Sequence, residues 1–314
     1  MKRSGRVQVK ADVPSKSFAA SDLVDSSRPA GSYPDVVREK LSIKINRLDA
    51  EAMEFELSGV DASTANALRR IMIAEVPTVA MEFLTVYKNS SILQEEILAQ
   101  RLGLIPIAVD PKVMDTLQGP IIFSLNKTCH GDLDSNVYSG DLEWVPTPDQ
   151  ESHFTKETAP RPVHDDILIV KLLPGQTVEI EAECIVGVGQ DHSKFSPVCT
   201  ASYRLLPQIE LKEPVKGKRA AALVSTCPMG VFDIEDGMVR ASNPRNCTMC
   251  RECLRSPDFI NTVKLSRVSN HFLFSVESTG SLSPEEIFKR SIAVLADKCD
   301  AVLECLHEGE LSLV

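Results

Sequence analysis

Three cysteines spaced two residues apart lie in the stretch RASNPRNCTMCRECLRSP, residues 240–257. They are Cys247, Cys250 and Cys253, and a more distant cysteine, Cys227, stands directly before Pro228. Thiolates at this spacing cap corners of a [4Fe–4S] cluster from one tight loop, while a remote cysteine supplies the last ligand. Zinc also accepts four thiolates, although structural zinc sites usually pair them as two separated knuckles. The pattern therefore predicts a [4Fe–4S] cluster, with zinc or a metal-free insert as alternatives.

The spacing is that of one half of a bacterial-type ferredoxin, in which the cysteine before proline ligates a cluster formed by the other run. The companion run is missing, because Gly217, Ala220 and Leu223 occupy its first positions and Pro257 stands where the last cysteine would be. The sequence thus predicts one complete site in a ferredoxin-like insert.

Composition limits the other classes of function. The chain has 314 residues and a formal net charge of −10, so it lacks the basic surface that neutralises nucleic-acid phosphates. No apolar run is long enough to cross a bilayer, and no secretory signal precedes the nine cysteines, which predicts a reducing compartment. We find no magnesium-binding D-x-D-x-D loop, no P-loop and no Rossmann glycine run, which predicts a non-catalytic protein. His164, Asp165 and Asp166 precede an apolar ILIV run and are interpreted as a loop before a strand.

The elements around these residues can be predicted from periodicity. Residues 41–60 alternate on either side of a break and predict a hairpin, and residues 61–76 predict a helix that ends before Pro77. Residues 81–89 predict a strand and residues 91–103 a short helix stopped by Gly103. Residues 110–180 mix short apolar runs with long polar connections, which is typical of a β-rich domain, and two more strands are predicted around a glycine-containing turn in residues 183–215. The stretch VFDIEDGMVRA predicts a hairpin that turns at Asp236 and Gly237.

The chain closes with two predicted strands, 263–268 and 271–277, and a long helix that begins after Ser283. Ser283 is a good N-cap, because Pro284 follows it and Glu286 stands three residues later. Apolar residues then recur every three or four positions and form a stripe along the helix. A second, narrower row of apolar residues on this helix leaves room for a partner helix. The stripe comprises Phe288, Ile292, Leu295, Cys299, Val302 and Leu306.

Several long segments carry a family resemblance. ANALRRIMIAEVP followed by LAQRLGLIPI, and later HDDILIVKLLPGQ, KFSPVCTASYRLLP and HFLFSVESTGSLSPEEI, resemble the α-like assembly subunits of cellular RNA polymerases. The sequences of these segments most resemble the α-like subunit shared by eukaryotic RNA polymerases I and III. The corresponding subunit of RNA polymerase II usually carries a cysteine knot after its LGLIP segment, and only Cys129 is available here.

The resemblance implies an α+β fold in which a dimerisation domain, built from two separate segments, carries an inserted β-rich domain and the ferredoxin-like cysteine insert. The implied divisions are a disordered tail (1–36), a first dimerisation segment (37–78), the β-rich domain (79–206), the insert (207–258) and a second dimerisation segment (259–314). The subunit would be non-catalytic and work in the nucleus and nucleolus, with only indirect contact to DNA.

The resemblance also implies partners and interface residues. A small α-like subunit would form a heterodimer with this chain, and the pair would nucleate assembly of the two large catalytic subunits. The implied contact residues are Asn66, Leu68, Arg69 and Arg70 for a large subunit or for dimer-helix packing, and Phe288, Ile292, Leu295 and Val302 for the pairing helix.

Two alternatives stay open from the sequence. An archaeal-type α-like subunit is one, because many members of that group carry ferredoxin-like inserts. An electron-transfer protein is the other, since the cysteine run alone is typical of a ferredoxin.

Overall fold

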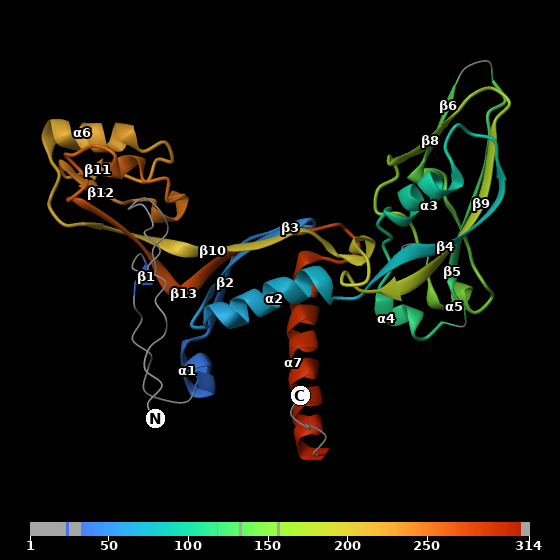
Figure 1. Ribbon diagram of the computed structural model, residues 1–314, viewed down its shortest axis with the longest axis horizontal. Coiled ribbons are helices and arrows are strands. Elements are labelled where there is room, and N and C mark those ends of the chain that lie inside the picture. The colour runs from blue at the N-terminus through green and yellow to red at the C-terminus, as the bar shows by residue number, and fades with distance from the viewer. Residues whose placement is uncertain (1–22, 25–32, 118, 132–133, 156–157, 309–314) are drawn as a thin grey trace, which may run out of the picture. The chain divides into compact units, whose positions relative to one another are not determined.

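A computed structural model describes residues 23–24, 33–117, 119–131, 134–155 and 158–308 (Figure 1). The predicted tail therefore lies mostly outside the described residues. The chain forms two compact units: unit 1 contains residues 1–41, 58–61 and 204–272, and unit 2 contains residues 42–57, 62–203 and 273–314. Helices and sheets occur in both units, which confirms the α+β class.

Unit 2 contains the predicted hairpin and the two longest helices. The hairpin comprises β2 (Ser42–Leu48) and β3 (Ala52–Ser58), and its turn is held by Asp49, whose Oδ1 accepts a hydrogen bond from the Ala52 amide at 2.6 Å. The backbone hydrogen bond from Ala52 lowers the pKa of Asp49. The helices are α2 (Ala62–Ala74) and α7 (Pro284–Glu308), and the Phe55 ring of β3 lies 4.7 Å from that of Phe288 in α7.

A four-stranded antiparallel sheet forms another portion of unit 2, in the order β4-β9-β5-β7. The helix α3 (Glu95–Gly103) packs on one face of it through Leu98 and Leu102, which are fully buried in the core. These observations confirm the predicted strand at 81–89 and the predicted helix that ends at Gly103. The other elements of this portion are β4 (Thr78–Asn89), α4 (Pro111–Met114), β5 (Ile121–Thr128), β6 (Ser135–Tyr138), η2 (Ser139–Asp141), β7 (Glu143–Val145), α5 (Gln150–His153), β8 (Leu168–Leu172), β9 (Thr177–Gly187) and η3 (Ser193–Phe195).

Unit 1 contains the cysteine segment. Its core is apolar and includes Leu223, Phe232 and Phe259. The predicted hairpin is present as β11 (Asp233–Glu235) and β12 (Met238–Arg240), with Asp236 and Gly237 both at positive φ, as a tight hairpin turn requires. The helix α6 (Gly217–Thr226) was not predicted from the sequence. The remaining elements of the unit are β1 (Leu23–Val24), α1 (Tyr33–Lys40), η4 (Pro244–Asn246) and η5 (Glu252–Leu254).

Two long strands have residues in both units: β10 (Val198–Leu211) and β13 (Val263–Ser278). They belong to a sheet with the order β1-β13-β3-β2, in which β10 also pairs with β13. The prediction of two separate strands at 263–277 is wrong, because β13 is continuous. The polar residues at its middle do not interrupt the strand, since the carbonyl of Asn270 accepts a hydrogen bond from the Gly59 amide at 3.0 Å.

Candidate functional site

The residues predicted on α2 differ sharply in exposure. Leu68 is 6% exposed and belongs to the core, whereas Asn66 and Arg69 are half-buried and Arg70 is exposed. The Asn66 side-chain oxygen accepts hydrogen bonds from Nε and Nη2 of Arg69 at 3.1 and 3.0 Å. Among the described residues, no carboxylate forms an ion pair with Arg69 or Arg70, so α2 presents two uncompensated cations at one face.

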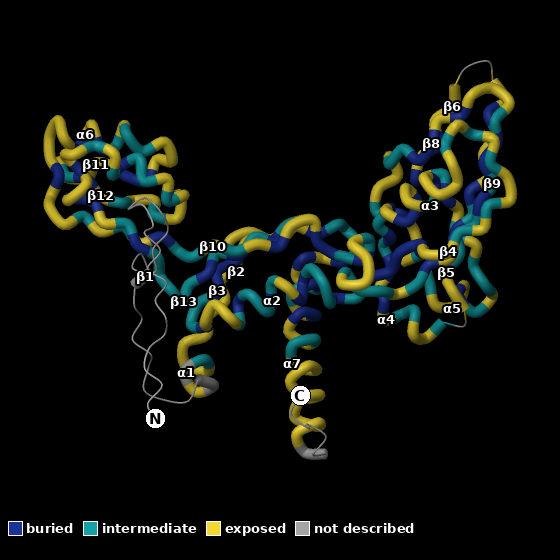
Figure 2. Tube along the Cα trace, in the orientation of Figure 1, coloured by how far each residue is buried: buried dark blue, intermediate teal, exposed yellow. Residues whose placement is uncertain are grey.

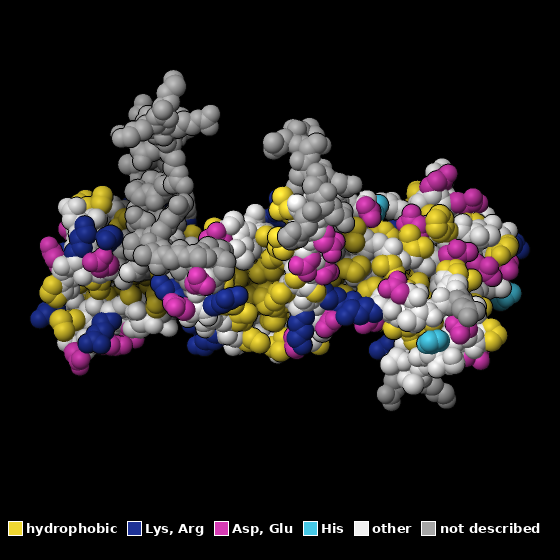
Figure 3. All heavy atoms as spheres, turned by 90° about the horizontal axis from the view of Figure 1, so that it is seen from below, with side chains coloured by type: hydrophobic (Ala, Val, Ile, Leu, Met, Phe, Trp, Pro, Cys, Tyr) yellow, Lys and Arg dark blue, Asp and Glu magenta, His cyan; other side chains and the backbone are white. Residues whose placement is uncertain are grey.

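The helix α7 begins buried and becomes exposed along its length (Figure 2). Ser283 caps its start as predicted, accepting a hydrogen bond from the Glu286 amide at 3.3 Å. Phe288 and Leu295 are half-buried, while Ile292 is 45% and Val302 56% exposed. Hydrophobic side chains gather beside this helix on the face shown in Figure 3. The far half of α7 therefore carries an apolar stripe that unit 2 itself does not cover.

A buried arginine fixes the near half of α7. The Arg290 side chain is 8% exposed; its Nε donates to Glu286 at 2.8 Å, and its Nη2 donates to both carboxylate oxygens of Asp110 at 2.9 Å. Burial by itself would lower the pKa of Arg290, but the hydrogen bonds to Glu286 and Asp110 outweigh it and raise the pKa. A second pair, Lys298 with Glu75 at the end of α2, lies further along the helix.

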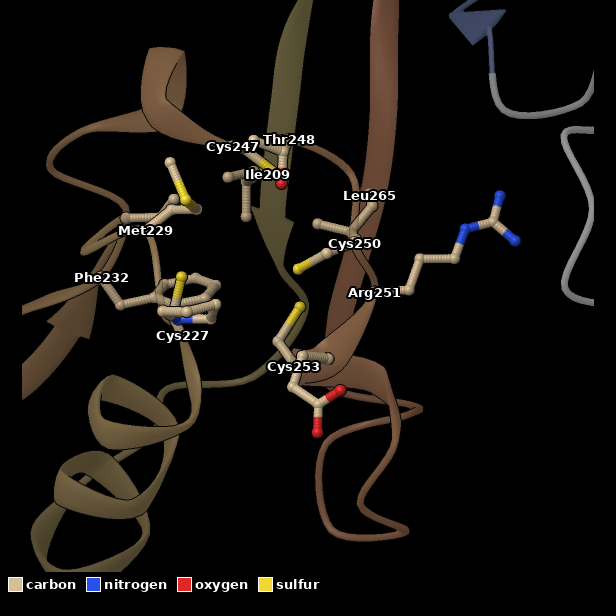
Figure 4. A pocket seen from close by; sticks show the side chains of 13 residues that line it. Ile209, Cys227, Met229, Phe232, Cys247, Thr248, Cys250, Arg251, Cys253 and Leu265 are labelled. Atoms are coloured by element: carbon tan, nitrogen blue, oxygen red, sulfur yellow. The ribbon is translucent and has the colours of Figure 1, made fainter.

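The four predicted cysteine ligands line one pocket in unit 1 (Figure 4). Cys227 follows the end of α6, and Cys247, Cys250 and Cys253 come from the segment that contains η4 and η5. The other lining side chains are largely apolar and include Ile209, Met229, Phe232 and Leu265. Sequence reasoning therefore identified the right group of neighbours.

Two of the four thiols in this pocket, those of Cys247 and Cys253, are buried. Burial raises the pKa of Cys253 to about 12 and also raises the pKa of Cys247. The loop between the cysteines places Met249 and Arg251 at positive φ, so its path is tightly bent. The pocket is partly open and has a volume of about 10 Å³, which is close to what a single water molecule requires.

Sequence comparison identifies the family. A profile described as the RNA polymerase Rpb3/Rpb11 dimerisation domain matches residues 54–299. The chain belongs to this family. The Rpb3/Rpb11 relatives include a protein of Dictyostelium discoideum named DNA-directed RNA polymerases I and III subunit rpac1, 47% identical over 289 residues, which cover 86% of this chain and 84% of that protein.

Two further relatives extend the comparison of this Rpb3/Rpb11-family chain. The RNA polymerases I and III subunit RPAC1 of Saccharomyces cerevisiae is 40% identical over 296 residues, 85% of this chain and 88% of that protein. The archaeal RNA polymerase subunit Rpo3 of Methanosphaera stadtmanae is 33% identical over 282 residues, 86% of this chain and all of that protein.

The prediction that the four cysteines bind a [4Fe–4S] cluster, or zinc as the alternative, is wrong. Within the described ranges, no group of three or more His, Cys, Asp or Glu side chains is arranged to hold a metal ion. The lining of the pocket is largely apolar, and burial raises the pKa of Cys253 to about 12. The similar proteins are polymerase subunits by name, which also removes the electron carrier as an interpretation.

The structure also bears on the remaining residues considered in the sequence. His164 and Asp165 lie in the loop before β8, as interpreted, and their carbonyls accept hydrogen bonds from Ser139 and Gly140. No helix of the described residues is long and apolar enough to span a membrane. Sequence reasoning missed Arg290 and Asp110, because they are 180 residues apart and neither lies in a recognisable motif.

Proposed function

We propose that this chain is the non-catalytic assembly subunit shared by DNA-directed RNA polymerases I and III. The observation that carries the proposal is the extent of the similarity: proteins with that name match at 40% and 47% identity over 85% and 86% of the chain. The archaeal relative matches at 33%, which favours the eukaryotic assignment. Such a subunit would work in the nucleus, and in the nucleolus where polymerase I acts.

We propose that α7 pairs this chain with a small α-like subunit. The large exposed apolar residues of α7 are Ile292 in its first half and Val302, Leu303 and Leu306 in its far half, with exposed fractions of 45%, 56%, 51% and 56%. Apolar side chains arranged along one side of a helix indicate a protein contact, because their burial against a partner is favourable by roughly 1.5–3 kcal/mol for each large side chain. Phe288 and Leu295, which are half-buried, would continue this surface towards unit 2.

We propose that the arginines of α2 contact a large catalytic subunit. Arg69 is oriented by Asn66, and Arg70 is exposed beside it. Arginine is enriched at protein interfaces, where its planar group forms paired hydrogen bonds with carboxylates. Leu68 would act from the core side of the same helix by fixing its position.

The domain divisions follow from the same assignment. We infer a dimerisation domain in two segments, 37–78 and 259–314, a β-rich domain inserted at 79–206, and a cysteine-bearing insert at 207–258 that follows it. Residues 1–36 would form a tail outside this framework. The net charge of −10 supports only indirect contact with DNA, through the partner subunits.

The pairing can be tested by placing charges on α7. In Val302→Asp/Leu306→Asp, two side chains that are each 56% exposed become anionic, so folding should be unaffected while a buried contact would be lost. We expect co-purification of the small α-like subunit with the tagged chain to fall at least ~10-fold, since each buried side chain is worth roughly 1.5–3 kcal/mol.

The matched control is Ala293→Asp, which adds the same charge to the same helix at an exposed position. It lies about 180° around the helix from Val302 at 100° per residue, so it should leave co-purification unchanged. Equal loss in both variants would contradict pairing through the stripe. Failure of the unaltered chain to co-purify with any polymerase subunit would refute the function itself.

A further inference from the structure

The outer face of the sheet formed by β4, β9, β5 and β7 is not part of the proposed pairing surface. On β9, Val178, Ile180, Ala182 and Cys184 are buried in the core. Because side chains alternate along a strand, the intervening residues Glu179, Glu181 and Glu183 project from the opposite face. Three carboxylates thus form a row along a central strand.

Apolar side chains flank one end of this row. Phe83 on β4 and Ile122 on β5 are both in register with Glu183, and Val145 on β7 is in register with Ile122. Phe83 is 60% and Val145 44% exposed. Large apolar side chains at such exposure on a sheet face, next to an ionised group, indicate a surface that a protein partner covers.

The rest of the face is acidic and polar. Glu181 is in register with Thr85 and Ser124, and Glu143 is in register with Ser124. Glu181 accepts a hydrogen bond from the Tyr87 hydroxyl at 2.8 Å, and this bond raises the pKa of Tyr87.

The carboxylates of this face lack cationic partners. Within the described portion of the chain, Glu143, Glu179, Glu181 and Glu183 form no ion pair, although Lys88 is in register with Glu179. Residues 78–203 contain 8 Lys and Arg against 18 Asp and Glu, a difference that equals the net charge of −10 of the whole chain. The field of this segment repels nucleic acid and anionic lipid, and it steers basic protein surfaces towards the sheet.

We propose that this face docks a basic segment of another protein. Carboxylates two residues apart on a strand are separated by about 6.6–6.8 Å, which matches alternate side chains of an extended segment. The occupant would place lysine or arginine at alternate positions over Glu179, Glu181 and Glu183. One large apolar side chain at its end would lie against Phe83 and Val145.

Photo-crosslinking in the full chain, expressed in cells, tests this docking. p-Benzoylphenylalanine replaces Phe83, and the adduct peptide is sequenced by mass spectrometry. We expect a protein peptide with at least three Lys or Arg at alternate positions, and at least ~10-fold less adduct in Glu179→Gln/Glu181→Gln/Glu183→Gln. Adduct formed in an extract should also decline from 0.1 M to 0.5 M salt, where the screening length falls below about 5 Å. The same photoreactive residue at Ile92, which is 80% exposed, is the control and should not yield this adduct.

Several outcomes overturn the proposal. They are an adduct with nucleic acid, with a second copy of this chain, or with a neutral or acidic peptide, and no adduct at all. An adduct that the glutamine variant leaves unchanged also overturns it. The three glutamates lie outside the core, so the variant should melt no lower than the unaltered chain. If it does melt lower, the salt dependence of the unaltered chain decides the outcome.

Discussion

The ion pairs of Arg290 give the sharpest test of how unit 2 holds α7. Arg290 joins α7 to Asp110, which also caps α4 by accepting a hydrogen bond from the Lys112 amide at 2.9 Å. In Arg290→Met a side chain of similar length loses the charge, which leaves Asp110 and Glu286 without their shared cation. Both carboxylates are partly exposed, at 45% and 36%, so water can solvate them after the change.

The expected loss is smaller than that of a fully buried pair. Breaking a fully buried pair costs about 3–5 kcal/mol, and solvation of the two remaining carboxylates should reduce this to about 2–3 kcal/mol. For a folded unit of this size, that lowers the melting midpoint by roughly 4–12 °C. Hydrogen–deuterium exchange should show faster exchange of the first half of α7, because this half loses its attachment to α4.

Lys289→Met provides the control on the same helix. Lys289 pairs with Glu285, and both side chains are at least half exposed, at 63% and 50%. Solvent screens an exposed pair of this kind, so the melting midpoint and the exchange of α7 should hardly change. Equal effects of the two substitutions would refute the assignment of Arg290 as the attachment of α7.

Two further predictions concern a close contact and the cysteine pocket. A Cβ at Gly189 would lie 2.3 Å from the carbonyl oxygen of Ile73 in α2, so Gly189→Ala should cost about 1–3 kcal/mol in urea unfolding. Gly103→Ala, whose Cβ would meet only ordinary contacts, should be neutral or stabilising by up to about 1 kcal/mol. Because the pKa of Cys253 is raised to about 12, iodoacetamide at pH 8 should alkylate the exposed Cys250 at least ~10-fold faster than Cys253. A metal chelator should change neither the two alkylation rates nor the melting midpoint. The raised pKa of Cys253 also means that the free energy of unfolding falls as pH rises from about 9 towards 12, because the thiol ionises first in the unfolded chain. If a chelator made Cys253 accessible to iodoacetamide, the prediction of a metal-free pocket would be contradicted.

Local signals predicted the elements that position the candidate surfaces. The hairpin of β2 and β3 follows from alternation around an Asp49 turn, and the start of α7 follows from Ser283. Gly103 ends α3 as predicted, although not at positive φ, so it does not form a left-handed cap. The helix α6 was missed because it is only ten residues long and no side-chain cap marks its start.

The faces of α7 could not be predicted in the same way. Periodicity placed Phe288, Ile292 and Leu295 on a single stripe, but the structure buries Ile287, Arg290 and Ser291 at the start of the helix. The buried charge of Arg290 is compensated by Glu286 on the same helix and by Asp110, and Asp110 comes from a segment far away in the chain. Long-range pairing of this kind leaves no periodic trace in one sequence.

The cysteines show why spacing can predict neighbours without predicting chemistry. The two-residue spacing, together with the hairpin between Cys227 and Cys247, brings the four side chains to one pocket, as the sequence indicated. Whether thiols bind metal depends instead on what surrounds them, because the charged thiolate must be stabilised before it can ligate. Here Phe232 and Leu265 line the pocket, and Cys247 and Cys253 are buried in the apolar core of unit 1, where burial raises the pKa of Cys253. Packing of apolar side chains therefore holds this part of unit 1 together, as expected of a structural element rather than a redox centre.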